Sequence, residues 1–344
     1  MTEALRVRDT AAVMFAAPLF TGTLFALAAG LMWGLVFVGP LLLPEYPATL
    51  QSFGRYLAFG LIALPLAWFD RRTLAQLTRA DWVEALKLAL VGNIVYYLFL
   101  ASAIQRAGGP LPTMIIGTLP VVIAVTANFG TRRAGVRVEA TLPWLQMLPS
   151  LGLIGTGIAL VNRVELEHLK ADPGADMARY ALGAALALGA VACWTWYPIR
   201  NAQWLRAHPD RSPRGWATAQ GLATLPLALA GYALTWSWFA LRGEAFVMPF
   251  GPRAADFLLL MFAIGLFASW LGTLCWNEAS QRLPPTLAGQ LIVFETLSAL
   301  AYAFMLRGRA PQPLTLAGVA LLIAGVVWAL RARPAAASAD AHPN

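Results

Sequence analysis

Apolar residues occur in long blocks that are separated by short turns rich in proline, glycine and arginine. Blocks of about 20 residues have the length that a helix needs to cross a hydrocarbon core. The pattern predicts ten transmembrane helices, at about 18–41, 47–68, 82–104, 110–129, 143–162, 179–199, 215–239, 254–279, 286–306 and 312–331. No connecting segment is long enough to form a soluble domain. We therefore expect an all-α polytopic membrane protein.

Composition and charge agree with this class. Hydrophobic residues make up 59% of the 344 residues and charged residues 12%, about half the charged fraction of a soluble domain. The formal net charge of +8 comes from arginines in the turns, so we expect no nucleic-acid partner. With the N-terminus inside, fifteen basic residues fall on the cytoplasmic side and eight on the other. The positive-inside rule then predicts that both termini are cytoplasmic.

The two ends of the chain are polar. Residues 1–15 form an N-terminal extension that lacks the pattern of a cleavable signal peptide, and a translation start at Met1 or at Met14 stays open. Residues 333–344 are expected to be a disordered tail.

The two halves of the chain resemble each other. Ala103-Ile104-Gln105-Arg106 ends the third predicted helix, and Ala279-Ser280-Gln281-Arg282 ends the eighth. At the same offset Pro120 corresponds to Thr296. The first and sixth predicted helices match less closely, at a different offset, and pair Trp33 with Trp194. An odd number of helices per half requires the halves to be inserted with opposite topology, so we predict two inverted five-helix repeats, 18–163 and 179–332. Inverted repeats are typical of secondary transporters, although apolar helices can also resemble each other by chance.

Several classes of chemistry lack their motifs. The chain has no G-x-x-x-x-G-K-[ST], H-E-x-x-H or G-x-S-x-G sequence, so we expect neither ATP hydrolysis nor an enzyme of those types. Cys193 and Cys275 lie inside apolar helices, whereas the histidines lie in loops or in the tail. We therefore expect no disulfide, metal site or cofactor.

Two charges fall inside predicted membrane helices. Glu295 lies about ten residues into the ninth helix, which is near the midplane. An acid at this depth is a candidate functional group, although it could also be a protonated packing residue. Arg55 lies in the second helix and could pair with Glu295, hold a substrate carboxylate or extend toward the outer surface.

Polar and aromatic residues at midspan are further candidates for substrate binding or coupling. Asn93, Tyr96 and Tyr97 have the spacing of one helical stripe, as do Ser269, Thr273 and Asn277. Such stripes either line a wet cavity or bond one helix to another. The remaining candidates are Trp33, Trp194, Trp276 and Gln290, and for the tryptophans core packing is the alternative.

The chain resembles the EamA-type branch of the drug/metabolite transporter superfamily. The resemblance rests on AAGLMWGLVFVGPLLL (28–43), LASAIQRAGGPLPTMIIGTLPVVIAVTANF (100–129) and WNEASQRLPPTLAGQLIVFETLSALAYAFML (276–306). Members of the family often have Glu-Pro in the fourth and ninth helices. At those positions this chain departs from the family pattern, with Leu119-Pro120 and Glu295-Thr296. The resemblance implies a ten-helix bundle with a central cavity in the bacterial inner membrane.

Together these observations predict a secondary transporter that exports small metabolites, above all amino acids or related compounds, by alternating access. A carrier of another small organic solute, or a non-transporting membrane enzyme, is the alternative. The expected partners are the solute and the lipid bilayer. Proton coupling, and a monomeric or homodimeric state, stay open.

Overall fold

The computed structural model describes residues 2–107, 110–123, 126, 144–170, 176–308 and 311–331, and all the regular structure in these ranges is helical. Within these ranges, seven helices are long and apolar enough to cross a membrane, namely Pro18–Leu42, Ala48–Phe69, Arg79–Ala107, Met177–Ala207, Pro213–Arg242, Ala254–Arg282 and Leu287–Leu306. They coincide with seven of the ten predicted helices. The polytopic, all-helical class is therefore confirmed.

The other three predicted helices are covered in part. The fifth and tenth lie within α9 (Trp144–Lys170) and α16 (Pro313–Arg331), whose apolar stretches are shorter, Met147–Leu160 and Pro313–Gly325. The fourth begins with α7 (Pro110–Ile116), and its predicted end at 129 lies outside the described residues. The count of ten and the positions of the termini stay predictions.

Several spans contain more than one helical element. The first joins α1 (Thr2–Trp33), a 3₁₀ segment η1 (Gly34–Phe37) and α2 (Val38–Leu42). The ninth consists of α14 (Pro285–Leu291) and α15 (Val293–Arg307), with a turn at Ile292. The other long helices are α3 (Ala48–Phe69), α10 (Met177–Ala207) and α11 (Pro213–Arg242).

The third and eighth spans each contain one π-helical segment. The third consists of α5 (Arg79–Leu88), η2 (Ala89–Val95) and α6 (Tyr96–Ala107), and the eighth of α12 (Ala254–Ile264), η3 (Gly265–Leu271) and α13 (Gly272–Arg282). The offset that relates Ala103 to Ala279 also relates η2 to η3. π-Helical turns are rare and frequent at functional sites, so both segments mark places where a site is expected.

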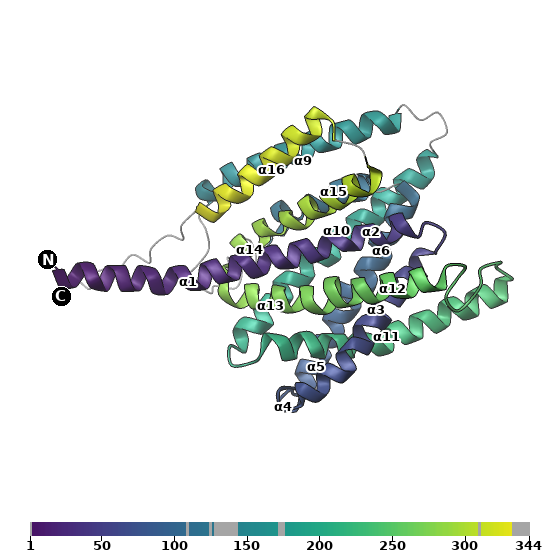
Figure 1. Cartoon of the computed structure of the whole chain (residues 1–344), viewed down its shortest axis with the longest axis horizontal. Coiled ribbons are helices and arrows are strands. Elements are labelled where there is room, and N and C mark those ends of the chain that lie inside the picture. Colours follow the sequence, from purple (N-terminus) through teal and green to yellow (C-terminus); the bar gives the residue numbers. More distant parts are fainter. Residues whose placement is uncertain are drawn as a thin grey trace.

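Helices at equivalent positions in the two halves pack antiparallel. Along the contact of α3 with α11, Gly60 lies against Leu225, and farther toward the C-terminus of α11 Gly231 lies against Phe53. Figure 1 also shows α9 beside α16 at one edge of the bundle, where Ser150 donates a hydrogen bond of 2.9 Å to the carbonyl of Gly325. The second predicted helix thus pairs with the seventh, and the fifth predicted helix pairs with the tenth.

The outer surface of the bundle is apolar. Side chains such as Trp68, Leu234 and Leu259 are 69–70% exposed on membrane-length helices. An apolar surface this extensive fits lipid rather than water as the surrounding solvent.

Two groups of turns define the ends of the bundle. One end carries the turns at 70–78, 208–212 and 283–284, and we call it the arginine-rich end because Arg71, Arg72, Arg79, Arg211 and Arg214 gather there. The opposite end carries the turns at 43–47 and 243–253, where the Tyr46 hydroxyl donates to the Phe250 carbonyl at 2.9 Å.

Candidate functional site

Glu295 lies inside the bundle near the start of α15. The residue is 1% exposed, and neither carboxylate oxygen has a hydrogen-bond partner among the described residues. Its backbone packs on Gly30 of α1, where a Cβ atom would come within 3.0 Å of the Glu295 nitrogen. A buried charged or polar group without a partner is costly, so this position calls for a functional explanation.

Arg55 faces the interior from α3 and is 4% exposed. Its Nε donates to the hydroxyl of Ser269 at 2.9 Å, and its Nη2 reaches the Ala268 carbonyl at 3.5 Å. Both partners belong to η3. The third nitrogen, Nη1, is buried and has no partner in the described part of the chain.

Tyr rings surround the Arg55 guanidinium. Its carbon lies 4.6 Å from the ring centroid of Tyr97 and 4.8 Å from that of Tyr56. Cation–π contacts of this length stabilise a buried guanidinium without neutralising it. Arg55 is thus oriented by its surroundings while one donor stays unused.

Tyr96 and Trp194 complete the surroundings of Glu295. Trp194 stacks on Tyr96 with ring centroids 4.6 Å apart and on Tyr197 at 5.0 Å, and Trp33 meets its edge at 4.9 Å. The indole N–H of Trp194 lies near the Glu295 carboxylate, Arg55 acts on the carboxylate electrostatically, and Tyr96 lies in the field of both Arg55 and Glu295. Within the described residues, the Tyr96 hydroxyl and the Trp194 Nε1 are also buried without hydrogen-bond partners.

We call Arg55, Tyr96, Trp194 and Glu295 the central site. Each contributes a buried polar atom that has no partner among the described residues. Buried polar groups in folded proteins are nearly always hydrogen-bonded. Four such exceptions in one place make the central site the candidate functional site.

The structure bears on the alternatives for Arg55. The residue is 4% exposed, so it does not extend to the outer surface. Ser269 and Ala268 hold the guanidinium at η3, and within the described residues Arg55 acts on Glu295 electrostatically without a direct hydrogen bond. Binding of a solute carboxylate stays a prediction.

The expected Asn93–Tyr96–Tyr97 stripe is divided. The Asn93 amide donates to Thr224 of α11 at 3.2 Å, whereas the Tyr97 hydroxyl donates to the Val36 carbonyl of η1 at 3.0 Å. The physical reason is η2, because a π-helical turn holds more residues than an α-turn and rotates the residues after it. Asn93 bonds helix to helix, and Tyr96 and Tyr97 reach the central site.

Asn277 belongs to a different network. It accepts from Asn201 at 2.8 Å and donates to the Pro213 carbonyl at 3.1 Å, while the indole of Trp216 donates to Asn201 at 2.9 Å. Asn277 is fully buried, and its amide is hydrogen-bonded on both sides. Of the two alternatives for its stripe, Asn277 therefore fits the one in which polar residues bond one helix to another. Ser269, in contrast, positions Arg55.

Trp276 and Gln290 lie farther toward the arginine-rich end. Trp276 contacts Trp33 with centroids 5.2 Å apart, and its Nε1 is buried with no partner among the described residues. Gln290 is 1% exposed, and neither atom of its amide is bonded within the same part of the chain. Their unsatisfied atoms extend the polar interior beyond Glu295 along α13 and α14.

A second group of charges lies at the arginine-rich end, and we call Asp70, Asp81, Glu84, Arg200 and Arg214 the end cluster. Arg200 forms two hydrogen bonds with Glu84, and its Nη2–Oε2 distance is 3.1 Å. Asp81 accepts from the Trp204 indole at 2.9 Å. Asp70 accepts from the Thr218 hydroxyl at 2.7 Å and pairs with Arg214 at 3.2 Å. Every acid in this cluster has a partner.

Sequence reasoning missed Tyr56, whose ring lies against the Arg55 guanidinium, and Asn201, which joins three helices. Tyr56 directly follows Arg55, so a search for aromatic neighbours of an intramembrane charge could have found it. Cys193 and Cys275 are free thiols. Among the described residues no group of three His, Cys, Asp or Glu side chains is arranged to hold a metal ion.

The comparisons with known proteins agree with this architecture. Residues 20–162 match the model of the EamA-like transporter family. The chain is also 55% identical over 316 residues to the inner membrane protein YtfF of Escherichia coli, covering 92% of this chain and 97% of that protein. The chain belongs to the EamA-like transporter family.

Family membership and the membrane-length helices together make this a multi-pass inner-membrane protein. A solved crystal structure with 18% sequence identity shares the fold, with a TM-score of 0.66 over 90% of this chain and 96% of the other. The resemblance expected from the sequence is thereby confirmed.

Proposed function

We propose that this EamA-like protein is a secondary transporter that exports small metabolites through the central site by alternating access. The observation that carries the proposal is the central site itself, where Arg55 and Glu295 are both buried and keep polar atoms that are unpaired within the described residues. Intramembrane charges mark solute or ion pathways. Family membership supports a transporter rather than an enzyme.

The chemistry of the site favours an amino acid or a related zwitterion. The free Nη1 of Arg55 suits a carboxylate, and the Glu295 carboxylate suits an ammonium group or a coupled proton. The stacked rings of Tyr96, Trp194 and Tyr197 offer a wall for the apolar part of the solute. A solute with one charge of each sign would satisfy both residues together.

The arrangement of the halves supports alternating access. The antiparallel pairs α3–α11 and α9–α16 are what inverted repeats produce, and each half carries a π-helical segment that contacts the other half. Asn93 of η2 bonds Thr224 of α11, and Ser269 of η3 bonds Arg55 of α3. Related contacts of this kind would exchange as one half rocks against the other.

The test is transport by purified protein in proteoliposomes loaded with a radiolabelled amino acid mixture. We expect efflux that depends on an imposed pH gradient if Glu295 couples protons, and on the solute gradient alone if it only binds solute. Glu295→Gln should abolish efflux in either case. Efflux that is equal for the variant and the wild type contradicts the proposed site, and a purified protein that moves no solute but converts a lipid would favour an enzyme.

A further inference from the structure

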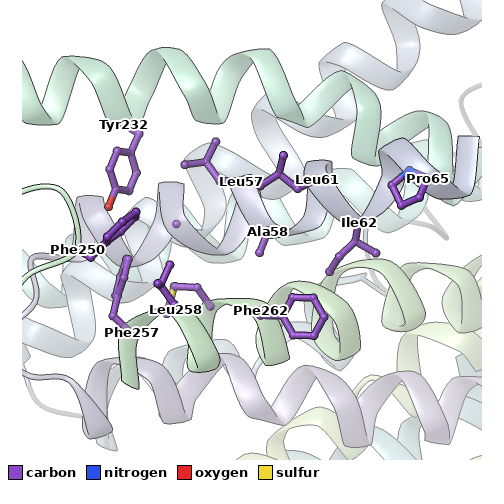
Figure 2. Close-up of a pocket in the computed structure, with 12 residues that line it drawn as sticks. Leu57, Ala58, Leu61, Ile62, Pro65, Tyr232, Phe250, Phe257, Leu258 and Phe262 are labelled. Atoms are coloured by element: carbon purple, nitrogen blue, oxygen red, sulfur yellow. The ribbon is translucent and has the colours of Figure 1, made fainter. Parts of the chain in front are cut away.

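An apolar groove of about 590 Å³ runs along the outer face of α3. Figure 2 shows α3 as its floor, with α11 on one side and α12 on the other. Apolar side chains line it from Gly54 to Pro65 on α3, and Leu258 and Phe262 form the α12 wall. The hydroxyl of Tyr232 in the lining is already used, because it donates to the Pro249 carbonyl at 2.5 Å. The lining therefore suits an apolar ligand.

The length of the groove corresponds to one leaflet of a bilayer. From Gly54 to Pro65 an α-helix rises about 16 Å, and half of a hydrocarbon core is about 15 Å. Phe250 and Phe257 line one end of the groove, next to the turn at 243–253. The other end, at Pro65, lies beyond the middle of α3. An acyl chain whose head group lies at the 243–253 end would therefore run along α3 to a point past its middle.

Positively and negatively charged side chains both lie at the end of the groove next to the turn at 243–253. Arg253, between Phe250 and Phe257 in the chain, pairs with Glu45 at 3.2 Å and with Asp256 at 2.7 Å. These hydrogen bonds raise the pKa of Arg253, so its charge persists. The side chains of all three residues are 36–55% exposed. A guanidinium and two carboxylates together complement a head group that carries a phosphate and an ammonium.

We infer that this groove binds one acyl chain of a zwitterionic phospholipid that carries a primary ammonium, with its head group at Arg253, Glu45 and Asp256. The position of the groove connects a bound lipid with the central site. Gly54 and Ala58 line the groove on either side of Arg55 in the sequence, and Ala58 also packs on Gly265 at the start of η3. A chain in the groove supports the contact of α3 with α12 and η3, on which the position of Arg55 depends.

The experiment is photocrosslinking in nanodiscs with phosphatidylethanolamine that carries a diazirine at the middle of one acyl chain. Labelled peptides are mapped by mass spectrometry. We expect labels to concentrate on Leu57, Leu61, Leu258 and Phe262, about fivefold above lipid-facing positions outside the groove such as Leu234, although Leu234 is more exposed than any of them. A fivefold excess corresponds to about 1 kcal/mol of preference. The matched phosphatidylglycerol probe should label the groove less.

Two variants distinguish the groove from general lipid contact. Leu61→Trp fills the groove and should reduce its labelling, whereas Leu234→Trp, at a 70% exposed position on α11 outside the groove, should not. Leu258→Trp repeats the test on the α12 side of the groove. Thermal melting shows whether each variant is folded. Even labelling of all lipid-facing helices overturns the inference. Equal labelling by both head groups overturns the assignment to a zwitterionic lipid.

Discussion

The central site and the end cluster both bury charges between the halves of the bundle, and they differ in how those charges are satisfied. At the end cluster, Asp70, Asp81 and Glu84 each meet a donor from α10 or α11. At the central site, Glu295 meets no donor among the described residues and Arg55 keeps one of its own unused. Paired charges specify how helices pack, whereas unpaired ones gain their partner only from a ligand.

This difference predicts that the end cluster contributes to stability and that the central site contributes to transport. Removing one partner from the end cluster should reduce stability, because the other charge is left buried. Removing the Glu295 charge from the central site should reduce transport without reducing stability, because no described residue is hydrogen-bonded to that carboxylate. Four variants test this separation, beginning with the largest expected effect.

Glu295→Gln should lower efflux at least about tenfold, equivalent to about 1.4 kcal/mol or more of lost solute or proton interaction. Its melting temperature should stay equal or rise, because a neutral amide costs less to bury than a carboxylate. Efflux from proteoliposomes, normalised to folded protein, measures the effect. Glu278→Gln is the control, because Glu278 pairs with Arg282 within α13 and should leave efflux unchanged.

Arg55→Lys keeps the positive charge and removes the planar guanidinium group with its several N–H donors. We expect efflux to fall about tenfold, because a lysine cannot bond Ser269 and a carboxylate in one geometry. A rise in KM with little change in maximal rate would place the loss in binding. If Arg55→Lys matches the wild type in efflux, Arg55 supplies only charge and the proposed carboxylate contact is wrong.

Glu84→Gln tests the other region. It should lower the free energy of unfolding by about 1–2 kcal/mol, a modest value because Arg200 is partly exposed. Efflux per folded molecule should not change. Thermal melting in detergent measures the loss, and the double variant with Arg200→Gln should recover part of it because Arg200 is then no longer left as an unpaired charge.

Trp194→Phe should give the smallest effect. Phenylalanine keeps a ring between Tyr96 and Tyr197 but removes the indole N–H that lies near Glu295. We expect KM to rise about two- to fivefold, a fraction of the roughly 1.4 kcal/mol that a tenfold change represents. An unchanged KM would reduce the role of Trp194 to packing.

Much of the fold can be predicted from the sequence because hydropathy alone fixes where a chain crosses a membrane. Seven helices lie where the apolar blocks predict them. Glu295 and Arg55 could be found in the same way, because a charge inside an apolar block stands out whatever its surroundings.

The partners of these residues could not be predicted, since they come from tertiary packing. The periodicity of an α-helix places Asn93 and Tyr97 on one face, but η2 changes the number of residues per turn and sends them to different helices. Asn277 has the polarity of a cavity residue, and only its contacts with Asn201 and Pro213 show that it joins helices.

The most direct test compares Glu295→Gln with Glu84→Gln in one experiment that measures both efflux and melting temperature. The account predicts that Glu295→Gln loses efflux at an unchanged or higher melting temperature, and that Glu84→Gln melts earlier with efflux per folded molecule unchanged. A parallel loss of efflux and stability in both variants would contradict the division between a ligand-binding central site and a structural end cluster.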